Sequence, residues 1–191
     1  MALQEIVLPT EVEDLWIAPA TTDLSSADVE LVANENRVFL LKDALAPEFL
    51  HGFDIVLMDC PPSLNLLTVN AMAAADAVLV PLQTEFFALE GLSQLMMTIR
   101  EVRQSANPRL RIEGVVLTMF DMRNNLCRQV EEDARANLGE LVYETRIPRN
   151  VRLSEAPSYA MPILQYDPNS RGSEAYISLA REVLSRQLQP A

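Results

Sequence analysis

The sequence predicts an α/β protein whose parallel sheet is covered by helices on both faces. Three observations support this class. Short apolar runs alternate with longer segments of helical periodicity, one of the runs is apolar throughout, and two prolines end that run abruptly. The chain has 191 residues, of which 49% are hydrophobic, so it can bury a sizeable core in one domain. We expect residues 15–191 to form that domain and the strongly acidic residues 1–14 to be disordered.

The predicted strands are short, apolar and bounded by turn residues. They cover residues 15–18, 55–59, 77–81, 114–119 and 142–147. The predicted helices alternate with these strands and have apolar residues at helical spacing. They cover residues 37–50, 64–75, 89–104, 126–138 and 174–187. We expect the apolar stripe from Leu89 to Ile99 to face the core, and the last helix to dock on the sheet.

Four prolines fall in the segment 148–169, which has little periodicity. The pattern favours an extended loop on the active face of the domain.

The run from Phe53 to Pro62 carries the strongest indication of a functional site. Residues 55–58 are typical of a strand buried on both faces, and the prolines after Asp59 end its ladder because they have no N–H. Asp59 would then close a parallel strand at its carboxyl end, where open α/β sheets bind ligands. An aspartate there typically holds Mg2+ through water beside nucleotide phosphates. The alternative is that Asp59 caps the following helix.

A phosphate-binding loop needs clustered glycines followed by a lysine, so that backbone N–H groups and an ammonium reach the phosphates. The glycines of this chain are far apart, at residues 52, 91, 114, 139 and 172. Its single lysine, Lys42, is predicted to lie inside a helix. The sequence therefore contains one half of a nucleotide site without the other.

The net charge of −12 is distributed unevenly along the chain. Residues 1–99 carry 15 acids against Arg37 and Lys42, whereas residues 100–152 carry ten arginines against eight acids. A polyanion is therefore more easily accepted by the second half, where arginine suits phosphate.

The sequence favours a cytoplasmic protein without membrane association. No apolar segment approaches the roughly 18 residues needed to cross a bilayer, and the amino terminus carries Glu5 where a secretory signal has basic residues. Cys60 and Cys127 are too few for a disulfide scaffold and do not have the spacing of a metal site, so we expect both to be reduced.

Six further strings follow one another along the chain: Asp59–Leu64, Val80–Gln83, Phe87–Leu92, Glu113–Met119, Ile147–Pro157 and Tyr166–Gly172. Together they resemble the ParA/Soj-type ATPases that partition bacterial chromosomes and plasmids, members of the deviant Walker A group that includes MinD. The resemblance runs from about Leu15 to Leu184 and implies a P-loop NTPase-like fold of the ParA/MinD type. The family's Lys-Gly-Gly-Val-Gly-Lys-Thr loop and its first two strands have no counterpart here. We therefore expect residues 15–191 to be the carboxyl-terminal two-thirds of such a domain, with the N-terminal strands absent.

The resemblance assigns the nucleotide site. Asp59 matches the catalytic Walker B aspartate, which would orient the water on Mg2+. Met119 and Pro148 would offer apolar faces to the adenine of ATP, and Arg149 would make an edge contact. For Met119, packing in the core is the alternative.

The resemblance also assigns DNA contacts. Arg123 and Arg152 match arginines that bind DNA without sequence preference, through phosphates and hence in a salt-dependent manner. The alternative is that both are ordinary solvated arginines. The segment that contains Glu85 and Glu90 would lie beside the dimer and partner surface.

The function implied is DNA partitioning by an ATPase that forms homodimers and binds the nucleoid in the cytoplasm. A ParB-type partner would stimulate its ATP hydrolysis. Because the main donors to the transferred phosphoryl group belong to the absent loop, we expect no ATP hydrolysis by this chain alone. The alternative is a non-catalytic truncated paralogue that binds DNA or a partner and regulates full-length ParA. An iron–sulfur reductase of the nitrogenase iron-protein branch would need cluster cysteines that Cys60 and Cys127 do not match, and MinD-like membrane cycling has less motif support.

Overall fold

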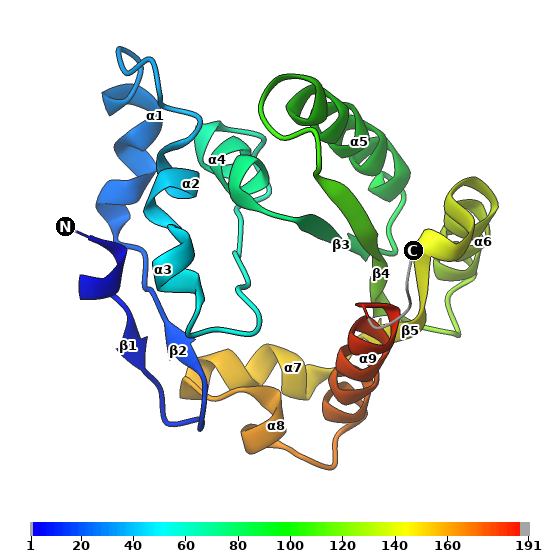
Figure 1. Cartoon of the computed structure of the whole chain (residues 1–191). Coiled ribbons are helices and arrows are strands. Elements are labelled where there is room, and N and C mark those ends of the chain that lie inside the picture. Colours follow the sequence, from blue (N-terminus) through cyan, green and yellow to red (C-terminus); the bar gives the residue numbers. More distant parts are fainter. Residues whose placement is uncertain (1, 188–191) are drawn as a thin grey trace. The chain divides into compact units, whose positions relative to one another are not determined.

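A computed structural model describes residues 2–187 of the chain, apart from the side chain of Asp28 (Figure 1). The chain divides into two compact units. One consists of residues up to 77 together with 95–111, and the other of residues 78–94 together with the chain from 112 onward.

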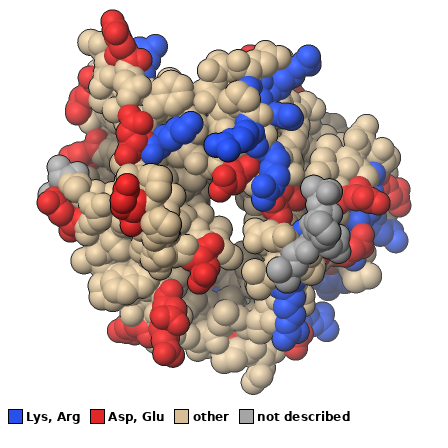
Figure 2. Space-filling view, in the orientation of Figure 1, with Lys and Arg blue, Asp and Glu red and all other residues tan. Residues whose placement is uncertain are grey.

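The first unit begins with a small antiparallel ribbon. Strand β1 (Leu8–Pro9) pairs with β2 (Trp16–Ile17), so the strand predicted at residues 15–18 belongs to this ribbon and its place in a parallel sheet was wrong. The acidic segment 2–14, expected to be disordered, includes β1 and the 3-10 turn η1 (Leu3–Glu5). In Figure 2 acidic side chains predominate over these N-terminal elements, at the left of the view, as the charge count predicts.

Between β2 and residue 77, the regular secondary structure of the first unit consists of short helices. They are η2 (Thr22–Ser26), α1 (Ala27–Glu30), α2 (Leu40–Ala44), α3 (Pro47–Leu50) and α4 (Leu66–Ala74). The helix predicted at residues 37–50 is interrupted before Pro47, because the residue preceding a proline avoids the helical conformation while proline itself suits a helix start. The helix predicted at residues 64–75 is confirmed as α4.

Buried Asn70 of α4 ties α2 to this helix. Its side-chain oxygen accepts the N–H of Leu41 at 3.2 Å, and its amide nitrogen donates to the carbonyl of Arg37 at 2.7 Å. Both ends of the amide are therefore satisfied inside the unit.

The strand predicted at residues 55–59 is absent. This segment has no regular secondary structure, and the exposed fractions of Ile55, Val56 and Leu57 are 50%, 42% and 88%. An extended segment becomes a strand only where a neighbour supplies hydrogen-bond partners, and neither described sheet includes this one. The apolar composition predicted burial, but composition alone does not provide a partner strand.

The second unit is built on a parallel three-stranded sheet flanked by helices, which confirms the predicted fold class. Its strands are β3 (Ala77–Gln83), β4 (Arg111–Phe120) and β5 (Val142–Pro148), in the spatial order β3-β4-β5. The longer helices of this unit are α6 (Asn125–Leu138) and α9 (Arg171–Gln187), and the 3-10 turn η3 (Gly139–Leu141) leads into β5. Helix α5 (Ala88–Ser105) belongs to this unit up to residue 94 and to the first unit from residue 95. Every one of these strands and longer helices was predicted, and Leu92 and Ile99 of the α5 stripe are buried as expected.

The core beside β5 confirms that the last helix docks on the sheet. Leu179 of α9 packs with Val116, Tyr143 and Ile147. The aromatic ring needs a glycine opposite it, because a Cβ added to Gly114 would lie 2.4 Å from Cε2 of Tyr143.

The segment 148–169 is helical rather than extended. It contains α7 (Val151–Glu155), η4 (Ala156–Tyr159) and α8 (Ile163–Tyr166). Pro157 lies in the first turn of η4, and Pro162 is the N-cap of α8. Two of the four prolines that favoured a loop, Pro157 and Pro162, therefore stand where the missing N–H is not needed, at helix starts.

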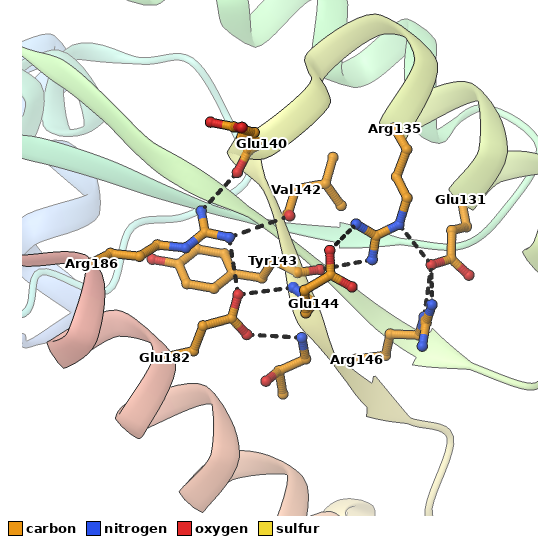
Figure 3. Close-up of polar contacts among 10 residues, drawn as sticks. Glu131, Arg135, Glu140, Val142, Tyr143, Glu144, Arg146, Glu182 and Arg186 are labelled. Atoms are coloured by element: carbon orange, nitrogen blue, oxygen red, sulfur yellow. Dashed lines mark hydrogen bonds and ion pairs between the residues drawn. The ribbon is translucent and has the colours of Figure 1, made fainter. Parts of the chain in front are cut away.

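Side chains from α9 bind the outer edge of β5 (Figure 3). The carboxylate of Glu182 accepts the backbone N–H groups of Glu144 and Thr145, each at 2.9 Å, and also accepts a bond from Arg186 at 2.9 Å. The Arg186 guanidinium donates to the carbonyl of Val142 at 3.3 Å. Polar groups of the strand edge are thus occupied by side chains.

Helix α6 contributes to the same edge through Arg135. Its guanidinium donates to the carbonyl of Tyr143 at 3.1 Å and to the carboxylates of Glu131 and Glu144 at 3.0 and 2.9 Å. Glu131 also accepts a bond from Arg146 of β5 at 2.7 Å. These contacts fix β5, whose carboxyl end carries two of the predicted site residues.

Candidate functional site

The carboxyl end of β4 has an unusual backbone at Met119. Its φ is +53°, in the left-handed region that non-glycine residues rarely adopt, and the β4–β5 register shifts between Leu117 and Phe120. The side chain is 37% exposed. Met119 is therefore presented at the surface by a bulge, and the alternative that it packs in the core is wrong.

Thr84, just after β3, supports this bulge and was missed by the sequence analysis. Its buried hydroxyl lies 3.3 Å from the carbonyl oxygen of Thr118, 3.4 Å from that of Met119 and 3.2 Å from the sulfur of Cys127. Its backbone N–H donates to Thr118 O at 3.2 Å. The only sequence signal was a polar β-branched residue directly following an apolar strand. Cys127 is buried and free, in keeping with a structural role.

The end of β5 lies directly beside this bulge. Pro148 stands opposite Phe120 in the ladder, and the N–H of Arg149 donates to Phe120 O at 3.0 Å. Pro148 is half-buried and Arg149 is exposed. The structure therefore brings Met119, Pro148 and Arg149 together at the carboxyl ends of two parallel strands, where α/β sheets commonly bind ligands.

Asp59 belongs to the first unit, and its side chain is exposed. Because residues 55–59 form no strand, the expectation that Asp59 closes a buried strand is wrong. The capping alternative is wrong as well, since the side chain of Asn65 caps α4 by accepting the N–H of Thr68 at 3.3 Å. Burial, and then the neighbouring Asp59 carboxylate, raise the pKa of the Cys60 thiol, which disfavours a thiolate there.

Arg123 is 90% exposed and is held by Asp121. The carboxylate accepts the Nε–H and Nη2–H of the guanidinium at 3.1 and 3.0 Å, and it accepts the backbone N–H of Arg123 at 3.0 Å. These hydrogen bonds, aided by the charges of Arg123 and Arg149, lower the pKa of Asp121 to about 2.

Arg152 is 54% exposed and has two acidic partners. Its Nη1 lies 2.9 Å from the carboxylate of Glu155, and its Nε lies 3.3 Å from that of Asp167. Glu155 also accepts the hydroxyl of Tyr166 at 3.1 Å. The interpretation of Arg123 and Arg152 as simply solvated is thus incomplete, because both are exposed but ion-paired.

Within residues 2–187, no three His, Cys, Asp or Glu side chains gather closely enough to hold a metal ion by themselves. In the same part of the chain, no helix combines the length and the apolar character that crossing a bilayer requires.

A family model described as an AAA domain matches residues 1–112. The chromosome partitioning protein ParA of Caulobacter vibrioides is 57% identical over 184 residues, which cover 96% of this chain and 69% of that protein. The chain belongs to the ParA/Soj family. The sporulation initiation inhibitor protein Soj of Bacillus subtilis is 51% identical over 179 residues, covering 94% of this chain and 70% of that protein. This ParA/Soj chain thus spans about two-thirds of the length of these relatives.

A solved structure extends the likeness to the fold. Cobyrinic acid a,c-diamide synthase of Mycobacterium smegmatis, with bound ADP and magnesium, superposes with a TM-score of 0.81 and is 34% identical, covering 98% of this chain and 68% of that one. Its identity is well below the 57% shared with the Caulobacter ParA, so the partitioning proteins are the better guide to function.

Proposed function

We propose that this chain serves DNA partitioning as a member of the ParA-type ATPases, whose cofactors in the intact family member are ATP and Mg2+. The observation that carries the proposal is the 57% identity to the Caulobacter ParA over 96% of the chain. The adenine would lie against the exposed side chain of Met119 and the ring of Pro148, with Arg149 at its edge. Asp59 would hold Mg2+ through water, as a Walker B aspartate does.

These 191 residues contain no glycine-rich loop with a lysine, which in this family supplies the main donors to the phosphates. Phosphoryl transfer depends almost wholly on such positioned charge, so the chain alone should not hydrolyse ATP. A phosphate-release assay on purified chain tests this. Turnover above the blank that Asp59→Ala removes would overturn the expectation that the chain alone is inactive.

The DNA contacts are assigned to Arg123 and Arg152, which would meet phosphates without reading bases. The chain would accordingly associate with the nucleoid in the cytoplasm and not with a membrane. Fluorescence anisotropy with a short duplex of random sequence should detect binding that weakens steeply as salt rises from about 50 to 200 mM. Arg123→Ala should weaken this binding for all sequences alike. Binding that is independent of salt or unaffected by this change would count against the assignment.

The proposed macromolecular partners are a second copy of the chain and a ParB-type protein. An exposed aromatic pair, Phe86 and Phe87, lies between β3 and α5 with exposed fractions of 75% and 72%. The rings meet edge to face at 5.0 Å and leave apolar surface uncovered within the described residues. The pair stands in the segment that contains Glu85 and Glu90. Sedimentation of wild type and of Phe87→Ala should show weaker self-association in the variant.

A second candidate function follows from the absence of the phosphate loop within this sequence. A chain without that loop could regulate full-length ParA as a non-catalytic DNA- or partner-binding protein. Adding it to an intact relative distinguishes the two functions, because a regulator lowers the DNA association of that relative and a bystander leaves it unchanged.

A further inference from the structure

The guanidinium of Arg123 is already occupied in this structure. Two of its N–H groups, Nε–H and Nη2–H, donate to the two carboxylate oxygens of Asp121 at 3.1 and 3.0 Å. A phosphate binds arginine through the same fork of parallel N–H groups. Carboxylate and phosphate therefore compete for one face of this side chain.

We propose that Asp121 is an intramolecular competitor of DNA phosphate, so that DNA binding through Arg123 is an exchange of carboxylate for phosphate. The inference rests on the proposed DNA-binding function and concerns its regulation. It predicts that the chain binds DNA more weakly than its exposed arginines alone would allow.

The Asp121 carboxylate is held in place by hydrogen bonds within the turn that contains it. Besides the guanidinium, Asp121 accepts the backbone N–H of Arg123 at 3.0 Å, and the carbonyl of Asp121 accepts the N–H of Asn124 at 2.9 Å. Arg149, at the end of β5, adds an attractive charge on the carboxylate. The carboxylate therefore stays near the fork after the guanidinium has turned toward a phosphate, and it continues to repel that phosphate.

Arg123 is better suited to such an exchange than Arg152. Its side chain is 90% exposed and its one acidic partner in the described part of the chain is Asp121, so a phosphate can reach it without displacing a second element. Arg152 is 54% exposed and is held by Glu155 of α7 and by Asp167, which follows α8. We therefore assign the exchange to Arg123.

The test compares DNA affinity of the full chain and of Asp121→Asn by anisotropy with a short random duplex. Asparagine keeps an oxygen for the N–H of Arg123 but removes the charge. We expect binding about two- to fivefold tighter at low salt, the range typical of releasing an exposed ion pair. The plot of log affinity against log salt should steepen by up to about one, because in wild type the freed Asp121 carboxylate takes up a cation, which offsets one of the ions released from DNA.

Glu132→Gln is the matched control. Glu132 is exposed on α6 and takes part in none of the ion pairs found in the described part of the chain, so the substitution makes the same charge change away from the fork. Asp121→Ser, which also keeps an oxygen beside the turn, serves as a second variant if asparagine perturbs the melting curve. Both Asp121 variants should exceed the control in affinity.

Three outcomes separate this inference from the proposed function. If wild type binds in an Arg123-dependent manner but Asp121→Asn is no tighter than Glu132→Gln, the competition is refuted and DNA binding stands. If the gain persists fully in an Arg123→Ala background, Asp121 acts through overall charge, which also refutes it. If neither wild type nor Asp121→Asn binds the duplex at low salt, the DNA-binding function itself is refuted, and the competition with it.

Discussion

Replacing Glu182 with alanine should remove hydrogen bonds that hold the outer edge of β5 to α9. Its carboxylate accepts three bonds of 2.9 Å, from the N–H groups of Glu144 and Thr145 and from the guanidinium of Arg186. The side chains of Glu182 and Arg186 are only 18% and 24% exposed, so water replaces these partners incompletely. Bonds to a charged acceptor contribute about 1.5–3 kcal/mol each when well buried, and partial exposure reduces this, so we expect Glu182→Ala to lower the free energy of unfolding by about 2–4 kcal/mol in total.

Urea unfolding measures this loss, and amide hydrogen exchange locates it. The N–H groups of Glu144 and Thr145 should exchange faster in Glu182→Ala than in wild type, while amides of β4 should be less affected. Arg181→Ala is the matched control on the same helix, since Arg181 is exposed and substitutions at such sites usually change stability by less than about 0.5 kcal/mol. A loss no larger than that of the control, with unchanged exchange at both amides, would refute the reasoning.

The stability lost in Glu182→Ala should also depend on pH, and the pKa of Glu182 fixes the direction of that dependence. Burial pushes the pKa of Glu182 upward, but the backbone N–H groups of Glu144 and Thr145 and the guanidinium of Arg186 outweigh burial and hold the pKa below its ordinary value of 4.5. A group with a lowered folded pKa stabilises the protein above its unfolded pKa and loses that contribution as pH falls through the folded value. The difference between wild type and Glu182→Ala should therefore be full near neutral pH and shrink below about pH 4.

Three further predictions concern the sheet and the residues at its carboxyl end. Gly114→Ala should lower the free energy of unfolding, measured by urea unfolding, by about 1–3 kcal/mol. The added Cβ would lie 2.4 Å from the Tyr143 ring and 2.8 Å from the Leu141 carbonyl. At Met119, with φ at +53°, glycine should be at least as stable as alanine in urea unfolding, the reverse of the usual order. Since the pKa of Asp121 is about 2, its charge does not change between about pH 5 and pH 8, so the affinity ratio of Asp121→Asn to wild type for DNA should stay constant over that range. A ratio that falls toward one at the acidic end would contradict this.

Periodicity predicted the second unit well, because its elements obtain their partners from nearby sequence. Strands β3, β4 and β5, helices α6 and α9 and the first part of α5 each bury an apolar face that the sequence displays directly. The same reasoning failed at residues 55–59. There the apolar composition was as strong, but a strand also needs a neighbour, and pairing is a property of the whole sheet and not of the segment.

The family resemblance named residues that the structure brings together, but it did not indicate the backbone that presents them. The family resemblance pointed to Met119, Pro148 and Arg149, and the parallel ladder places them together because Phe120 and Pro148 share a register position. The left-handed backbone of Met119 and the buried Thr84 hydroxyl beneath it had no such signal. The backbone of Met119 and the position of Thr84 both depend on the pairing of β3 with β4 at their carboxyl ends. The sequence of a strand end does not indicate whether that end contains a bulge.

The ion pairs show most clearly what a sequence leaves open. Asp121 and Arg123 are near neighbours in the chain, yet a carboxylate and a guanidinium at that spacing meet only if the intervening backbone turns. Arg152 and Asp167 meet because α7, η4 and α8 fold the intervening segment back on itself. A count of arginines against acids predicts which half of the chain attracts a polyanion, but the folded turns decide how much of that charge is free. On this surface the acids that reduce the net charge are the same groups that hold the arginines in place, so under the proposed exchange the affinity for phosphate would depend on these local ion pairs more than on the total charge.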